Sequence, residues 1–172
     1  MYDEKYYKER LPEKKEIVED DVSFIKTLNV KTILEVGCAK GLLLVSLKKN
    51  GFYVDGIDIS DDFVKNSYLK IKKADICDYK SKKKYDLVIC FEILEHISKE
   101  KLKTACRNVS DLSKKFILIH SPWKKEKDPD PTHVTIKPKF WWKKQFREFK
   151  EEKIKYHSFD NYIDDSLLLV RT

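Results

Sequence analysis

The sequence predicts an α/β fold, with a doubly wound, mostly parallel seven-stranded sheet and helices on both of its faces. Five short apolar runs favour this architecture, because helix-length stretches of mixed polar and apolar residues separate them. The runs cover residues 31–36, 53–59, 71–74, 85–91 and 116–120. Runs that are apolar at nearly every position are typical of strands that helices cover on both sides. Repeated alternation of strand and helix then implies a parallel sheet.

One domain is expected to span residues 1–172, since this length suits a single core. It opens with a leading helical segment, residues 1–28, in which residues 13–28 form a plausible amphipathic helix. Further along, residues 99–112 also show helical spacing.

The last third of the chain changes character. Residues 122–138 hold several prolines and charges without periodicity, which indicates a loop over one edge of the sheet. A helix is expected at residues 139–149, followed by two terminal strands at 153–158 and 166–171. Three aromatic residues would share one face of that helix: Trp142, Phe146 and Phe149.

Composition leaves the partner open. Of the 172 residues, 38% are charged, and the formal charge of +7 suits either an anionic partner or an ordinary solvated surface with interleaved acids. No apolar run approaches the ~20 residues that span a bilayer, and no signal peptide is evident, so we expect a cytoplasmic protein without a membrane span. The four cysteines form no Cys-x-x-Cys pair, which predicts reduced core thiols and no metal site.

The turn after the first predicted strand carries the most informative pattern, EVGCAKG at residues 35–41. Small residues at alternate positions let backbone amides at the start of the next helix approach a polar ligand without an intervening Cβ. The dinucleotide fingerprint needs a third glycine where this chain has Leu42, so NAD binding is disfavoured. The pattern acidic-x-Gly-x-small-x-Gly resembles the class I methyltransferases that use S-adenosylmethionine.

This resemblance covers nearly the whole chain, and it implies an antiparallel last strand. In the family, the turn after the first strand contacts the methionine part of the cofactor. The resemblance assigns that role to Glu35, Gly37, Cys38, Ala39 and Gly41. Ala39 stands where glycine is more usual, and it fits without strain if its φ is negative.

Two aspartates after later strands are expected to bind the adenosyl group. Asp58 closes the second strand, where its two carboxylate oxygens can accept both ribose hydroxyls; the alternative role is a helix cap, for which Ser60 is the better candidate. Asp75 resembles the family's acid that accepts a hydrogen bond from the adenine amino group, with an ordinary loop aspartate as the alternative. Ile59 and Ile76 would line the same site. The whole prediction requires the first turn and Asp58 to converge on one cleft.

The fourth predicted strand runs into FEILEH at residues 91–96, which resembles the fourth-strand motif of the small-molecule branch of the family. Phe91 and Glu92 would line the methionine end of the cofactor. The branch that methylates amino groups of nucleic acids usually has Asn or Asp, two prolines and an aromatic residue here, so that route is disfavoured. His96 is a candidate catalytic residue, while Glu95 and His96 can equally have a structural role in orienting the following loop.

Histidines are the candidate bases, because an imidazole titrates near neutrality and can take a hydroxyl proton. His133 lies between a Pro-rich turn and two tryptophans, Trp141 and Trp142, and resembles the acceptor-facing histidine of sugar, lipid or quinone methyltransferases. It is the first candidate, with a loop histidine bonded to backbone as the alternative, and His120 is the second. At least one of the tryptophans is expected in the core.

The resemblance implies in-line transfer of the methyl group of S-adenosylmethionine to an oxygen, or less readily a nitrogen, of a small-molecule, glycan or lipid-type acceptor, with S-adenosylhomocysteine as product. Two alternatives stay open. RNA methylation is indicated by the charge of +7 and by the lysines at 80, 82, 83 and 84, and a non-catalytic cofactor-binding subunit would need no acceptor. Tyr2, Tyr6 and Tyr7 can fold over the cofactor as a lid or belong to a frayed terminus.

Overall fold

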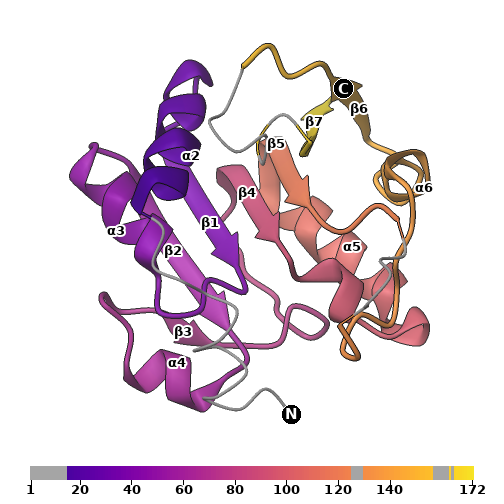
Figure 1. Ribbon diagram of the computed structural model, residues 1–172, viewed down its shortest axis with the longest axis horizontal. Helices are drawn as coiled ribbons and strands as arrows, with labels where there is room; N and C mark the ends of the chain where they lie inside the picture. Colours follow the sequence, from indigo (N-terminus) through magenta and orange to yellow (C-terminus); the bar gives the residue numbers. More distant parts are fainter. Residues whose placement is uncertain (1–14, 125–129, 157–162, 164) are drawn as a thin grey trace.

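The computed structural model describes residues 15–124, 130–156, 163 and 165–172. Within them, seven strands form one sheet in the order β3-β2-β1-β4-β5-β7-β6 (Figure 1). Strand β7 is antiparallel to both of its neighbours, and the other pairs are parallel, which confirms the predicted α/β sheet with its antiparallel last strand. The strands are β1 (Thr32–Val36), β2 (Tyr53–Asp58), β3 (Lys72–Lys73), β4 (Tyr85–Phe91), β5 (Ser113–His120), β6 (Phe149–Glu152) and β7 (Leu167–Arg171).

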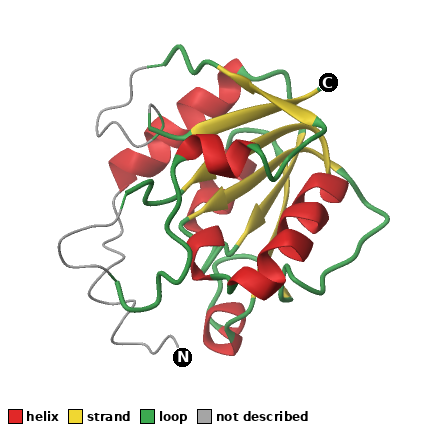
Figure 2. Cartoon of the chain, turned by 90° about the vertical axis from the view of Figure 1, so that its right-hand side faces the viewer, coloured by secondary structure: helices red, strands yellow, loops and turns green. Residues whose placement is uncertain are grey.

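Helices cover both faces of the sheet, as Figures 1 and 2 show. Successive side chains of a strand point to opposite faces, so each central strand supplies two cores. On one face, Ile33 and Leu87 pack with side chains of the helices at residues 15–27 and 42–49. On the other face, Leu34 and Val88 pack with side chains of the helix at residues 99–112. The helices are α2 (Lys15–Thr27), α3 (Leu42–Lys49), α4 (Asp61–Lys65), the 3-10 turn η1 (Leu94–His96), α5 (Lys99–Leu112) and α6 (Lys139–Lys143).

The predicted helix over residues 139–149 is wrong in length, because α6 ends at Lys143. Trp142, Phe146 and Phe149 are all buried, but a short helix, a turn and the first residue of β6 place them there. Hydrogen bonds between residues three apart, such as Phe146 N to Lys143 O at 3.1 Å, close that turn. The strand expected at 153–158 is also misplaced: β6 begins four residues earlier, and its last three residues are exposed and charged, as on a protected sheet edge.

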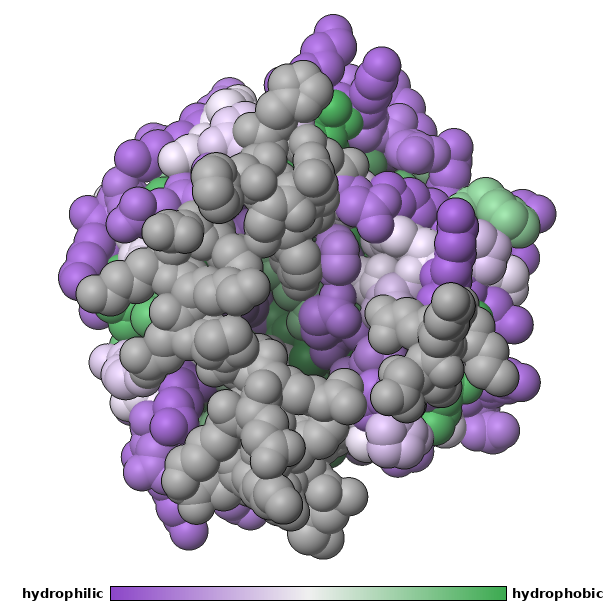
Figure 3. All heavy atoms as spheres, viewed as in Figure 1, coloured by the Kyte–Doolittle hydropathy of each residue, from purple (hydrophilic) through white to green (hydrophobic). Residues whose placement is uncertain are grey.

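The charged residues lie mostly at the surface, and the described part of the face in Figure 3 is largely hydrophilic. All four cysteines are free and buried, as predicted. Across the described ranges, we find no helix with the length and apolar character that a membrane crossing requires. The tyrosines expected as a lid, at positions 2, 6 and 7, lie outside the described residues.

Candidate functional site

The predicted cofactor residues meet at one edge of the sheet. Strands β2, β1 and β4 are parallel neighbours, so the loops that follow them leave from the same edge. The amide of Gly37 donates to Ile57 O at 2.8 Å, and the amide of Ala39 donates to Asp58 Oδ2 at 2.8 Å. The first turn and Asp58 are therefore in direct contact, as the prediction requires, and the cofactor cleft that they would share stays a prediction.

The first turn is built from three residues with positive φ: Gly37 at 70°, Ala39 at 46° and Gly41 at 79°. The negative φ considered for Ala39 is wrong: the residue lies in the left-handed region, and its amide donates to Asp58. A Cβ on Gly37 would lie 1.9 Å from Cδ1 of Ile93, so the glycine lets the turn after β1 pack against the segment after β4. Glycine at this position is therefore required by packing within the protein.

Three buried carboxylates surround this turn. Glu35, at the end of β1, has an Oε2 atom without a hydrogen-bond partner among the described residues. Burial raises the pKa of Glu35 to about 8, and the negative charges of Asp21 and Asp58 add to the shift. Asp21 belongs to α2 and escaped the sequence prediction, although an acid on the apolar stripe with Val18, Val22 and Ile25 was a visible signal. The cluster favours a ligand with positive charge.

Asp58 has capacity left for a ligand. Its Oδ2 accepts from Ala39, and its Oδ1 accepts from the amide of Ser60 at 2.8 Å, yet each carboxylate oxygen can accept a second hydrogen bond. Burial raises the pKa of Asp58, although these backbone N–H groups oppose the shift. Ser60 caps α4 by accepting from Phe63 N, which confirms it as the helix cap.

The other adenosyl candidates lie after β2 and β3. Asp75 accepts from the amide of Cys77 at 2.8 Å, which shapes its own loop. Ile59 is 57% exposed, whereas Ile76 is buried in the core. Their roles toward the cofactor stay predictions.

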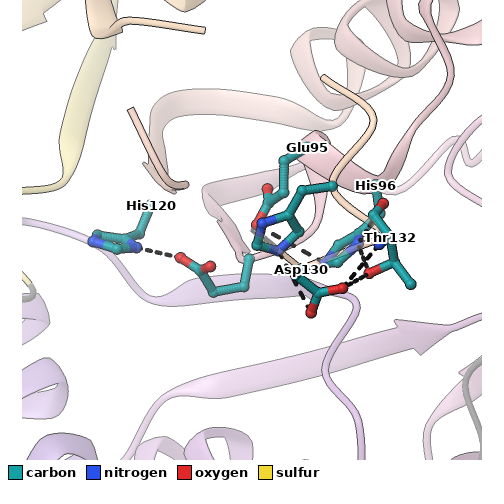
Figure 4. Close-up of polar contacts among 7 residues, drawn as sticks. Glu95, His96, His120, Asp130 and Thr132 are labelled. Carbon is teal, nitrogen blue, oxygen red and sulfur yellow. Dashed lines mark hydrogen bonds and ion pairs between the residues drawn. The ribbon is translucent and has the colours of Figure 1, made fainter. Parts of the chain in front are cut away.

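A second polar group lies beyond the end of β4, where Glu92 has a φ of 52°. Its carboxylate contacts Nδ1 of His120, at the end of β5 (Figure 4). Burial opposes ionisation of Glu92, but the hydrogen bond and charge of His120 hold its pKa below the usual value. Phe91, half-buried, packs on the α2 and α3 face of the sheet, away from the α5 core.

Glu95, His96 and His133 come together beside this pair. Glu95 is fully buried, and burial, with the charge of Glu92 next, raises its pKa to about 9. His96 lies edge-on to His133, with 4.7 Å between the ring centroids. Burial, and then the nearby His133, lower the pKa of His96. All three predicted histidines, His96, His120 and His133, therefore lie in one region of the molecule.

The main chain of Glu95 also holds the loop after β5. Its carbonyl oxygen accepts from the amides of Val134 and Thr135, both at 2.9 Å. The Thr135 hydroxyl donates to Ile97 O at 3.0 Å. The structural role weighed for this segment, orienting the following loop, is therefore present, and it leaves the Glu95 side chain available for something else.

Two further features lie away from this edge. Trp142 is fully buried and donates from its indole nitrogen to Lys137 O, which confirms one tryptophan as core. The lysines at 80, 82, 83 and 84 precede β4. They therefore lie at the amino end of this strand, whereas the proposed site lies at the carboxyl ends of the strands. A hollow of about 360 Å³ lined by Lys80, Lys82 and Lys84 lies there too.

Comparison with known sequences and structures identifies relatives of this fold. The ubiquinone biosynthesis O-methyltransferase of Rickettsia canadensis is 34% identical over 90 residues, which cover 47% of this chain and 38% of that protein. The chain thus spans well under two thirds of that relative. The magnesium protoporphyrin IX methyltransferase of Synechocystis PCC 6803, solved with bound SAH, superposes with a TM-score of 0.71 at 20% identity, covering 91% of this chain and 82% of that one.

A SAM-bound amino pentose methyltransferase from Micromonospora echinaspora superposes with a TM-score of 0.75 at 12% identity, covering 100% of this chain and 98% of that one. At such identities, the two superpositions show a shared fold. The sequence profile of the family described as "Methyltransferase domain" matches residues 7–156, which is most of the chain. The chain therefore belongs to the methyltransferase-domain family.

Proposed function

We propose that the protein transfers a methyl group from S-adenosylmethionine to an oxygen of a small-molecule acceptor. The observation that carries the proposal is the group of buried carboxylates, Asp21, Glu35 and Asp58, around a glycine-rich turn. S-adenosylmethionine carries a sulfonium and an ammonium cation, which such a group attracts. The pyrophosphate of NAD would be repelled, in agreement with Leu42 at the third position of the fingerprint.

The residues divide into binding and transfer roles. Glu35 and the turn 37–41 would hold the methionine part, Asp58 the ribose hydroxyls, and Asp75 the adenine. The cofactor supplies both the electrophile and the leaving group, so the protein has to hold the acceptor oxygen in line with the methyl group and exclude water. A hydroxyl acceptor must also lose its proton. We assign this step to His120, the second candidate from the sequence, and its hydrogen bond to Glu92 supports the assignment.

Relatives support an oxygen acceptor. The matching curated proteins include O-methyltransferases of ubiquinone biosynthesis and a magnesium protoporphyrin IX methyltransferase from Arabidopsis thaliana, and these act on small molecules. For the alternative acceptor, RNA, the lysines at 80–84 would need to lie near the cofactor edge, whereas they precede β4. The cytoplasm remains the proposed compartment, in keeping with four free thiols.

Calorimetric titration with S-adenosylmethionine and with NAD tests the cofactor. We expect the wild type to bind only the first, and Asp58→Ala to weaken it about 30-fold or more, since two charge-assisted hydrogen bonds are lost. Asp62→Ala is the matched control, because Asp62 is exposed on α4. This variant should bind S-adenosylmethionine with the affinity of the wild type. Equal binding of S-adenosylmethionine by Asp58→Ala and wild type, or preference for NAD, would refute the assignment.

Methyl transfer is then measured with radiolabelled cofactor against hydroxylated quinones, phenols and total RNA. Label in the small molecules supports the proposal. Label in RNA would favour the alternative acceptor, and cofactor binding without any transfer would favour a non-catalytic subunit.

A further inference from the structure

The Glu95 side chain has no use in the roles assigned so far. It is 0% exposed, and neither carboxylate oxygen has a partner with hydrogen-bond geometry among the described residues, although Glu92 and Ser121 lie beside it. Nδ1 of His133 is likewise buried and lacks a hydrogen-bond partner within the same ranges. Burying an unpaired carboxylate is unfavourable, because it loses the hydration that stabilises its charge. Two such groups side by side point to a ligand that satisfies both.

The donor atoms are close enough to share one ion. One ligand atom from each of Glu95, His96 and His133 lies within 4.8 Å of the others. Nε2 of His96 lies 4.0 Å from Oε1 of Glu95, and both residues belong to η1 (Figure 4). His133 comes from the loop after β5. Small side-chain rotations would bring such donors to the ~2.0–2.2 Å that metal ligation requires.

A hydrogen-bond chain fixes the proton on His96. Its Nδ1 lies 3.2 Å from the carbonyl oxygen of Thr132, which can only accept, so Nδ1 carries the hydrogen. The Thr132 hydroxyl lies 3.0 Å from the same nitrogen and donates in turn to Asp130 Oδ1 at 2.6 Å. Nε2 of His96 is then the nitrogen with a lone pair, on the side of Glu95. Outer hydrogen bonds of this kind orient the histidine ligands of metal sites.

We propose that Glu95, His96 and His133 bind a first-row divalent cation of the Zn²⁺ type. Two imidazoles and one carboxylate form a ligand set typical of zinc and of other first-row divalent ions, whereas Mg²⁺ and Ca²⁺ prefer sites made of oxygen alone. The site differs from the metal-free protein that the cysteine spacing predicted, because its donors are histidines and a glutamate from distant segments. Glu92, which neighbours Glu95, is a further carboxylate within the region.

The role of the cation in methyl transfer rests on the proposed function, whereas cation binding does not. Three protein ligands leave positions for an acceptor hydroxyl, whose oxygen the cation would orient and acidify. His120, outside the ligand set, then remains available to accept the proton. Cation binding itself needs neither cofactor nor acceptor, so it is measured separately from methyl transfer.

Isothermal titration of the chelator-stripped chain with Zn²⁺ tests the site, and Co²⁺ absorption reports the ligand environment. We expect one equivalent of Zn²⁺ to bind the wild type with micromolar or tighter affinity. Glu95→Gln and His133→Gln should each weaken binding at least 30-fold. His157→Gln is the matched control, because it changes the fourth histidine of the chain in the same way, and its affinity should not change.

A stability measurement separates a ligand from a structural residue. Without metal, Glu95→Gln should melt no lower than the wild type, because the amide is neutral without taking up the proton that burial forces on Glu95; Zn²⁺ should raise the melting temperature of the wild type alone. Absence of stoichiometric binding, or equal binding by Glu95→Gln and His133→Gln, would overturn the proposal. Should S-adenosylmethionine fail to bind while Zn²⁺ binds as expected, the proposed function falls and the cation site stands.

Discussion

The two sides of the proposed active site are built differently. On the cofactor side, the turn after β1 and Asp58 interact through backbone amides, and the residues lie within two short motifs. On the acceptor side, three separate segments meet through their side chains: Glu92 bonds to His120, and Glu95 lies close to His133. A site held by backbone geometry leaves a readable pattern of small residues in the sequence, whereas a site assembled from side chains leaves only scattered residue types.

A substitution at Gly37 should disturb both sides of the site, because the turn after β1 packs there against the segment after β4. An alanine there would place a Cβ 1.9 Å from Cδ1 of Ile93 at a φ of 70°, which adds strain and overpacking. We expect Gly37→Ala to destabilise the fold by about 3 kcal/mol and to abolish binding of S-adenosylmethionine. Gly51→Ala is the control, since φ is 89° but no atom lies within 4 Å, and it should cost only about 1 kcal/mol. Urea unfolding and calorimetry measure both effects; similar losses in the two variants would contradict the role of Ile93.

The ionisation of Glu35 affects both the stability of the fold and the binding of the cofactor. The folded chain keeps the Glu35 proton between pH 4.5 and about 8, where the unfolded chain has lost it, so this group makes stability fall as the pH rises through that interval. At pH 8 without cofactor, Glu35→Gln should therefore be about 2 kcal/mol more stable than the wild type, yet bind S-adenosylmethionine about tenfold more weakly. Glu19→Gln, on the exposed face of α2, should leave the pH profile unchanged. Parallel profiles for Glu35→Gln and wild type would exclude this explanation.

Thr135 tests whether the acceptor side is independent of the cofactor side. Thr135→Val removes the hydrogen bond to Ile97 O, and we expect a loss of about 1 kcal/mol with unchanged affinity for S-adenosylmethionine. Ser110→Ala removes a hydroxyl that bonds within its own helix α5, and should cost less. Thermal melts and cofactor titration decide, and a large loss of cofactor affinity in Thr135→Val would show that the two sides are coupled.

Ala39 gives the smallest expected change. Its φ of 46° strains an L-residue, so Ala39→Gly should stabilise the fold by about 0.5 kcal/mol after the added entropy of the unfolded chain is counted. The same change at Ala105, buried inside α5, should destabilise by about 1 kcal/mol or more. Destabilisation by Ala39→Gly in urea unfolding would contradict the strain.

Local patterns explain which parts of the fold were predictable. Helix α5 occupies residues 99–112 as expected, because its apolar spacing is unbroken, and the central strands are apolar on both faces. Strand β6 was placed too late, since Phe149 is its only buried residue and the rest has no alternation. In the site, Gly37 and Asp58 followed from motif spacing. Asp21 and the pairing of Glu95 with His133 depend on tertiary packing, which periodicity does not report.

The carbonyl oxygen of Glu95 accepts two consecutive amides, those of Val134 and Thr135. One acceptor thereby holds the part of the loop after β5 that contains these two residues. In hydrogen-exchange experiments, we expect these two amides to become labelled together with η1, because an opening of η1 that moves the Glu95 carbonyl breaks both hydrogen bonds. A substrate that displaces this part of the loop breaks its hydrogen bonds to η1. Entry and release of molecules at the acceptor side are therefore coupled to the end of β4, which Glu92 follows.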